Sequence, residues 1–219
     1  AVAECRRMGI DVRPPDVHRS HLGFTVEGEA IRFGLLAVKN VGEGAIQSII
    51  DQREDGGEFR SLTDFCSRVD TRLANRKVLE SLTRVGALNC FGHPAQVLMG
   101  LDDALAAGQA AQRDRISGQF SLFDMGGDDA AALERPLPAT PETPVRERLR
   151  WEKELMGLYL SDHPMGEVAE KVGLFVTAYS GDMRDESLDG QRVVLGGIVT
   201  GLRTIITKEF HYIRNFRPQ

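Results

Sequence analysis

Apolar residues recur at helical spacing through the first half of the chain. One set precedes a glycine-containing turn and a second set follows it; the members are Ile31, Leu35, Val38, Ile46, Ile49 and Ile50. This spacing predicts two short helices joined by the turn. Before them, the prolines at 14–15 exclude a helix, so we expect residues 1–30 to be irregular, apart from a short extended stretch around residues 24–26.

Three further helices are predicted within the first 110 residues. Ser61 and Asp64 match a capping box in front of an apolar stripe. Asn75 is placed to cap a helix that ends near Gly86, and Pro94 favours the start of another. We therefore expect this part of the chain to be mainly α-helical.

The second half has a different pattern. Residues 124–144 contain two adjacent glycines and four prolines, which is typical of a linker. A helix is predicted from 145 to 160, and β-branched runs at 193–200 and 204–207 predict strands. The expected fold is mainly α, with too few strands at the end for a stable sheet.

Charge changes this picture because it is unevenly distributed. The formal net charge of the 219 residues is −5, which excludes nucleic-acid binding through overall positive charge. By segment the net charge is 0 for 1–100, −9 for 101–190 and +4 for 191–219. A basic face in the neutral first segment is compatible with these counts, as is an ordinary mixed, solvated surface.

Cysteine usage and hydropathy favour a cytoplasmic protein. The three cysteines, Cys5, Cys66 and Cys90, cannot all pair within the chain. There is no apolar run of 18 residues and no signal-type N-terminus, so we expect neither a membrane span nor secretion. A metal site at Cys5, His18 and His21 is disfavoured, because no second pair of ligands accompanies them.

The turn at 40–44 is the most informative motif. Helix-hairpin-helix modules direct backbone amides at a DNA phosphate, and glycines in the hairpin permit the close approach. Asn40 tolerates the left-handed conformation, whereas Glu43 is unfavourable for a phosphate; an ordinary turn between helices fits the same residues. Nearby basic residues complete the candidate DNA-contacting set: Lys39, Asn40, Gly42, Gly44, Arg72, Arg76 and Lys77.

A second motif is an apolar pentapeptide in an acidic setting. It consists of Gln119, Phe120, Ser121, Leu122 and Phe123. Such a peptide can insert Leu122 and Phe123 into a pocket on a partner protein, with Gln119 fixing the register by hydrogen bonds. A local staple that folds back onto the helices explains the same residues equally well.

Several of these stretches together resemble one family, the alpha subunit of bacterial replicative DNA polymerase III. The matching segments are 4–17, 31–35, 38–45, 59–66, 75–80, 85–88 and 154–164, and their order and spacing extend to about residue 208. The resemblance implies five regions: the end of the fingers region at 1–30, a tandem helix-hairpin-helix domain at 31–108, a linker with a clamp-binding motif at 109–144, a connecting helical segment at 145–190, and a truncated start of an OB-type β-barrel at 191–219.

The resemblance also implies a function. The expected partners are double-stranded DNA, the sliding clamp (beta subunit) at 119–123, and other replicase subunits of the parent protein. The catalytic aspartates of the family have no counterpart here, so we expect no cofactor in this chain, only magnesium in the active site of the parent. Two alternatives are polymerase activity only within a full-length parent, and a helical scaffold without DNA affinity. Because the chain starts at Ala1 and departs from the family after Lys208, we expect a fragment with an incomplete barrel.

Overall fold

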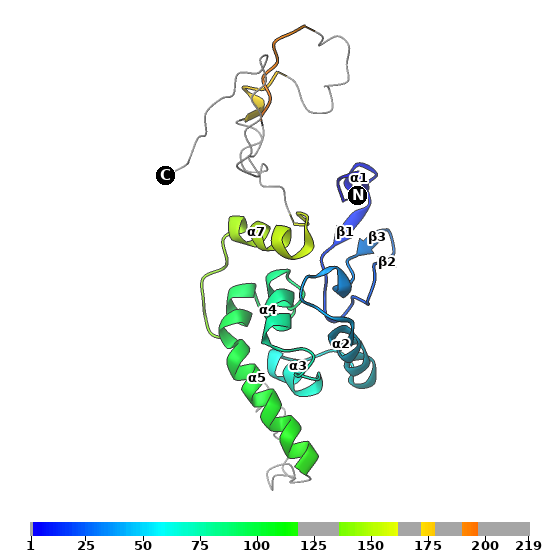
Figure 1. Ribbon diagram of the computed structural model, residues 1–219, viewed down its shortest axis with the longest axis vertical. Helices are drawn as coiled ribbons and strands as arrows, with labels where there is room; N and C mark the ends of the chain where they lie inside the picture. Colours follow the sequence, from blue (N-terminus) through cyan, green and yellow to red (C-terminus); the bar gives the residue numbers. More distant parts are fainter. Residues whose placement is uncertain (1, 118–135, 162–171, 178–189, 197–219) are drawn as a thin grey trace. The chain divides into compact units, whose positions relative to one another are not determined.

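The computed structural model describes residues 2–117, 136–161, 172–177 and 190–196. The chain divides into two compact units, 1–163 and 164–219, and each is considered by itself. The elements labelled in Figure 1 all lie in the first unit. They confirm a mainly helical fold and add a small sheet, of which the sequence predicted only the extended stretch around residues 24–26.

A helix and three strands replace the irregular chain expected for residues 1–30. These elements are α1 (Val2–Arg7), β1 (Asp11–Arg13), β2 (Thr25–Glu27) and β3 (Ala30–Arg32). The strand order is β1-β3-β2, with β1 parallel and β2 antiparallel to β3. β2 confirms the extended stretch expected around residues 24–26. β1 and β3 were missed because strands of three residues are too short to show a period of two.

The helix predicted from Ile31 is also absent, and Ile31 lies in β3 instead. Only one short 3-10 helix, η1 (Leu35–Ala37), follows the strand. Gly34 lies against the backbone of Gly23, so closely that a Cβ atom on Gly34 would come within 2.4 Å of the Gly23 carbonyl carbon. This long-range contact between backbones holds the chain extended, and residue spacing alone could not reveal it.

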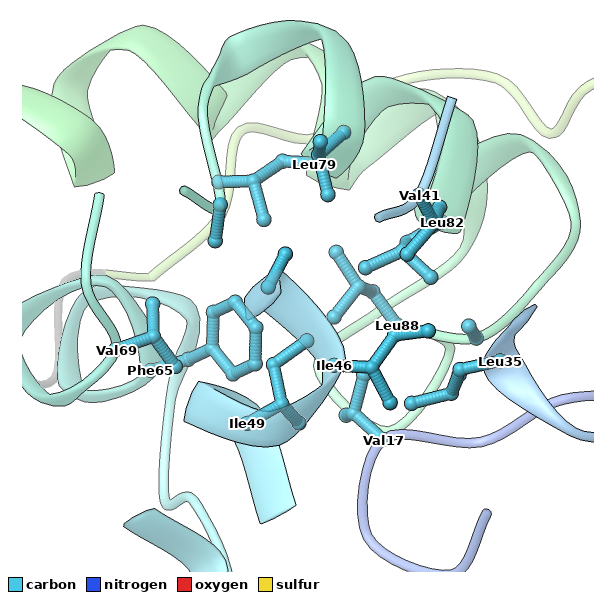
Figure 2. Close-up of a cluster of buried hydrophobic side chains, with 14 of the residues drawn as sticks. Val17, Leu35, Val41, Ile46, Ile49, Phe65, Val69, Leu79, Leu82 and Leu88 are labelled. Atoms are coloured by element: carbon cyan, nitrogen blue, oxygen red, sulfur yellow. The ribbon is translucent and has the colours of Figure 1, made fainter. Parts of the chain in front are cut away.

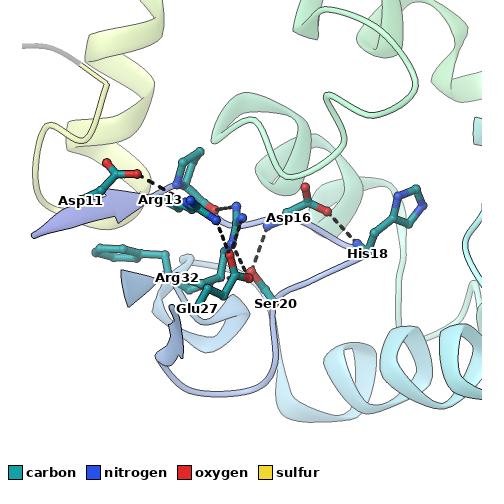
Figure 3. Close-up of polar contacts among 9 residues, drawn as sticks. Asp11, Arg13, Asp16, His18, Ser20, Glu27 and Arg32 are labelled. Carbon is teal, nitrogen blue, oxygen red and sulfur yellow. Dashed lines mark hydrogen bonds and ion pairs between the residues drawn. The ribbon is translucent and has the colours of Figure 1, made fainter. Parts of the chain in front are cut away.

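Polar contacts hold the sheet to the loop that follows β1 (Figure 3). The buried Arg32 guanidinium donates to Glu27 at 3.0 and 2.8 Å and to the Pro14 carbonyl at 2.9 Å. Arg32 and, less strongly, Arg13 lower the pKa of Glu27 from its ordinary 4.5 to about 2. The Ser20 hydroxyl donates to the Phe33 carbonyl at 2.7 Å.

The helices after the first turn agree with the prediction. They are α2 (Glu43–Gly56), α3 (Leu62–Arg68), α4 (Arg76–Arg84) and α5 (Pro94–Ser117). Ser61 caps α3 by accepting the Asp64 N–H at 3.0 Å, and Asn75 caps α4 by accepting the Val78 N–H at 3.2 Å. α5 continues into the stretch from residue 109 that we expected to be linker.

One hydrophobic core lies beneath these helices (Figure 2). Ile46 and Ile49 of α2, Phe65 of α3, and Leu79 and Leu82 of α4 are fully buried in it. Because α2 and α4 pack into the same core, both helices belong to one folded unit. A binding surface formed by their first turns requires this.

Helices α3 and α5 make an especially close contact. Gly108 of α5 lies against the backbone of Cys66, where a Cβ atom would come within 2.5 Å of the Cys66 carbonyl. The side-chain amide of Gln112 donates to carbonyls at the end of α3, at 3.1 Å for Cys66 and 2.7 Å for Val69. These bonds satisfy carbonyls that a helix end otherwise leaves without partners.

The last helix of the first unit is α7 (Val145–Met156). It ends at Gly157, which has a φ of 78°, so it is shorter than the predicted 145–160. The buried carboxylate of Glu152 accepts the N–H groups of Leu160 at 2.6 Å and Ser161 at 3.1 Å. These bonds fold the following chain back onto the helix.

The expected OB-type strands are not confirmed. Residues 191–196 have no regular secondary structure, and 197–219 lie outside the described residues. Within the second unit, the Thr177 N–H donates to the Val194 carbonyl at 3.0 Å, and the Val194 N–H donates to the Thr177 hydroxyl at 2.8 Å. The barrel therefore stays a prediction.

Candidate nucleic-acid interface

The first hairpin joins η1 to α2 and contains an unusual backbone conformation. Asn40 has a φ of 69°, and it is the one non-glycine with a positive φ in the described part of the chain. Asparagine adopts this region more readily than most residues, so the hairpin forms without glycine at this position. Asn40 therefore supports the hairpin geometry that the motif predicted.

The N-terminus of α2 is open. Its N-cap residue, Gly42, has no side chain to accept a hydrogen bond from the first turn. The N–H groups of Glu43 and Gly44 donate to no atom among the described residues, and both residues are exposed. Free amides at a helix N-terminus carry partial positive charge and form a ready site for an anion.

The second hairpin, between α3 and α4, is different because a side chain caps the helix that follows it. The Asn75 side chain caps α4, as described above. The N–H groups of Leu73 and Ala74 donate to the Asp70 carbonyl, and the Arg72 N–H donates to the Asp70 carboxylate at 2.9 Å. The N–H groups of Arg76 and Lys77 in the first turn of α4 donate to no atom among the described residues, so this helix also keeps two amides for a phosphate.

The two hairpins meet along α4. The Asn40 side-chain amide donates to the Ser81 hydroxyl at 3.1 Å, and that hydroxyl donates to the Lys77 carbonyl at 2.9 Å. At the other end, a Cβ atom on Gly44 would lie 3.5 Å from a methyl group of Leu73. The first hairpin thus extends from beside Ser81 to beside Leu73, and Lys77 lies between these points. We call residues 39–44 and 72–77 the hairpin surface.

The basic side chains of the hairpin surface divide into two groups. Lys39 and Lys77 are exposed and form no ion pair within the described residues. Arg72 pairs with Asp70 at 2.9 Å, and Arg76 pairs with Glu80 at 2.8 Å and with Asp102 of α5. The hydrogen bonds to these carboxylates raise the pKa values of both guanidinium groups. The lysines are therefore the cations most available to a ligand.

Helix α7 also supports the first hairpin. The backbone N–H of Lys39 donates to the Leu155 carbonyl at 2.9 Å. Leu155 is buried in the hydrophobic core, which fixes this contact. Sequence reasoning did not identify Leu155, Ser81 or Leu73 as part of the site, because their importance comes from contacts between residues distant in sequence.

The other sequence candidates are less informative. The ring of His18 accepts the Phe59 N–H at 3.1 Å and stacks on the Phe59 ring, which gives this histidine a structural role. No cluster of three potential metal ligands occurs among the described residues. The clamp-motif residues, 119–123, lie outside the described part of the chain. Within the described residues, no helix is long and apolar enough to cross a membrane.

Comparison with known proteins gives first the class and then the family. A family profile of the helix-hairpin-helix motif matches residues 9–98, which contain both hairpins. The chain is 45% identical over 168 residues to the DNA polymerase III alpha subunit of Deinococcus radiodurans, covering 75% of this chain and 12% of that protein. For the subunit of Thermus aquaticus the identity is 44% over 167 residues, covering 75% and 13%. For Escherichia coli K12 it is 34% over 210 residues, covering 94% and 18%.

These matches confirm the resemblance expected from the sequence. The chain contains a helix-hairpin-helix domain, and it is related to a segment of the bacterial DNA polymerase III alpha subunit. It spans less than a fifth of the length of the relatives named above.

Proposed function

We propose that the hairpin surface binds duplex DNA through its phosphates and does not read the bases. The observation that carries this proposal is the open N-terminus of α2, in a hairpin that Asn40 attaches to α4 one helical turn from the unpaired Lys77. A DNA phosphate can accept hydrogen bonds from the two free N–H groups, and an ammonium group on the same surface adds attraction for the charged oxygens of the backbone. No base-reading element is required, so the expected affinity is independent of sequence.

The surface offers few cations, so the binding should be weak. Two free lysines correspond to about two neutralised phosphates, and each contributes a slope of roughly −0.9 to log K against log salt concentration. Arg72 and Arg76 contribute less in this proposal, because their carboxylate partners must be displaced before either contacts DNA. From the sequence alone, the two lysines and the two arginines were equal candidates for contact with DNA. In this proposal the lysines contribute more than the arginines.

The test is a titration of the full 219-residue chain with fluorescent duplex DNA at several salt concentrations. We expect affinity to fall with salt, and Lys77→Ala to weaken binding and reduce the magnitude of the slope by about 0.9. Arg60→Ala is the matched control. Arg60 is exposed, lies outside the hairpin surface and comes after the C-terminal end of α2, a helix of 14 residues and thus about 20 Å in length.

Two outcomes would reject the proposal. Absence of a salt dependence in the wild-type chain would favour the alternative of a helical scaffold without DNA affinity. An equal loss in Lys77→Ala and Arg60→Ala would indicate general charge attraction rather than a phosphate site on the hairpin surface.

We also propose that residues 119–123 attach the chain to a sliding clamp. The motif has the Gln-x-x-Leu-Phe pattern. The described chain on both sides of it belongs to the DNA-contacting unit: α5 precedes it, and after it the Thr140 carbonyl lies 3.1 Å from His93 Nε2. A clamp held at this motif would keep the hairpin surface close to the duplex it encircles.

Together these two contacts support a role in DNA replication as a holding and tethering segment. The sequence lacks a counterpart of the family's catalytic aspartates, so we assign nucleotide addition and its magnesium ions to other parts of the parent polymerase. In this proposal the chain increases the time that a polymerase spends on its product duplex.

A further inference from the structure

Leu73 is a large apolar side chain of the hairpin surface, beside the first turn of α2. It is 48% exposed and lies in the second hairpin, next to the exposed Arg72. One of its methyl groups approaches Gly44 in the open first turn of α2, where a Cβ atom would be 3.5 Å away. The side chain therefore borders the two free amides and also faces solvent.

The polar groups of the second hairpin turn itself are already paired within the protein. The N–H groups of residues 72–74 donate to Asp70, and the Arg72 guanidinium is paired with the Asp70 carboxylate. Leu73 is thus the side chain of this hairpin that can gain contact area when DNA covers the surface. Along a DNA strand, charged phosphates alternate with deoxyribose sugars. The C–H groups of each sugar form an apolar surface.

We propose that the two hairpins divide the contact chemistically. The first hairpin and Lys77 hold a phosphate, and Leu73 packs against the deoxyribose next to that phosphate on the same strand. This inference rests on the proposed duplex-binding function and adds a second kind of contact to it. Burial of apolar area does not release counterions, so the contribution of Leu73 should not depend on salt.

The experiment compares Leu73→Ala with Lys77→Ala in the full chain, using the same duplex and salt series. We expect Leu73→Ala to reduce affinity by about three- to tenfold at every salt concentration, since it removes partly buried methyl groups. Its slope should equal that of the wild-type chain. Lys77→Ala should change the slope, and Leu73→Met should restore most of the affinity.

Val26→Ala is the matched apolar control, because Val26 is 79% exposed and lies on β2, outside the hairpin surface. Thermal unfolding of each variant separates loss of contact from loss of fold. Wild-type affinity in Leu73→Ala, together with weaker binding in Lys77→Ala, would overturn this inference and leave the phosphate site intact. Failure of the wild-type chain to bind duplex DNA would overturn both.

Discussion

Asn40 contributes to the first hairpin through both its backbone conformation and its side chain, whereas a glycine could contribute only the backbone conformation. Its backbone adopts the left-handed conformation that the hairpin requires, at a φ of 69°. Its side chain donates to Ser81 and so attaches the first hairpin to α4. In this geometry Asn40 positions the free amides of Glu43 and Gly44, and its own side chain is engaged within the protein.

Glu43 opposes phosphate binding by the first hairpin. It occupies the first position of α2, beside the free amides, where its negative charge favours the helix but repels a phosphate. We expect Glu43→Gln to increase duplex affinity by about fivefold at low salt, given roughly 1 kcal/mol for unit charges 4 Å apart in water. The variant should lose about 0.3–1 kcal/mol of unfolding free energy.

Glu29→Gln is the control for this effect, because it makes the same change in net charge at an exposed turn of the sheet. Fluorescence titration gives the affinities, and urea denaturation gives the stabilities. Equal increases in affinity for both variants would show that net charge, rather than the charge at α2, limits binding.

The sequence identified most residues of the hairpin surface but not their relative importance. Arg72, Arg76 and Lys77 were equal candidates because all three are basic and close to one hairpin. The structure separates them through carboxylate partners, and one partner, Asp102, lies 26 residues from Arg76. A pairing over that separation leaves no periodic signal, so it could not be predicted from sequence.

At the scale of elements, the two hairpins have similar roles in the fold but different chemistry. Each hairpin leads into a helix, the first into α2 and the second into α4. Of these two helices, only α4 has a side-chain cap on its first turn. Asparagine capping stabilises α4 and removes a potential phosphate ligand at the same time. Helix α2 lacks that side-chain cap, and in both helices the first two N–H groups donate to no atom among the described residues.

The contact between α3 and α5 depends on Gly108. In a free helix, Gly→Ala is stabilising by about 1 kcal/mol. Here the new Cβ would come within 2.5 Å of the Cys66 carbonyl, and backbone cannot yield as a flexible side chain does. We expect Gly108→Ala to destabilise the chain by about 1–3 kcal/mol in urea denaturation, as overpacking does elsewhere.

Gln109→Ala is the companion variant, since it introduces the same residue at the adjacent exposed position of α5. Its stability should be close to that of the wild-type chain. If Gly108→Ala proves as stable as Gln109→Ala, the close approach of α3 and α5 is not required for the fold.

The N-terminal sheet should be sensitive to acid. A carboxyl whose pKa falls on folding contributes stability that is complete above its ordinary pKa and is lost as pH falls through the folded pKa. For Glu27 this window extends from about pH 4.5 to about pH 2. We expect the wild-type chain to lose more unfolding free energy across this window than Glu27→Gln, which has no carboxylate to protonate.

Other carboxylates titrate in the same window, so the comparison is made between variants. Glu29→Gln should keep the acid sensitivity of the wild-type chain, because no ion pair involving Glu29 occurs among the described residues. Identical pH profiles for Glu27→Gln and the wild-type chain would show that the Arg32 contact does not stabilise the sheet.

The sequence predicted the start of a helix correctly where an apolar stripe and a capping side chain occur together. The helices α3 and α4 have apolar stripes and side-chain caps at Ser61 and Asn75, so their starts were predicted correctly. The strands β1 and β3 form through pairing between residues such as Val12 and Ile31, which are far apart in sequence. Pairing of this kind, in strands of three residues, overrides the helical spacing that begins at Ile31.

At the scale of the whole molecule, the distribution of charge limits what the hairpin surface can do alone. The segment 1–100 is neutral and 101–190 has a net charge of −9, so long-range attraction to DNA is weak. Free lysines on the hairpin surface add a local attraction only. A second attachment therefore matters more for this chain than it would for a strongly basic protein.

Linking the duplex contact and the proposed clamp contact makes the second binding event intramolecular. Avidity of this kind commonly increases affinity by about 100-fold or more without any new contact. We expect the full chain to bind a sliding clamp loaded on duplex DNA at least that much more tightly than it binds the duplex alone. Replacing Leu122 and Phe123 together by alanine should return the affinity to the level of the duplex alone.

The chain provides a matched control for this experiment. Leu174 and Phe175 form another adjacent Leu-Phe pair, and both side chains are highly exposed, at 83% and 74%. If apolar exposure alone caused clamp binding, replacing this second pair by alanine would weaken it as much as replacing the first. A specific tether instead requires that only the pair at 122–123 matters, and that Lys77→Ala weakens binding to the loaded clamp but not to the clamp without DNA.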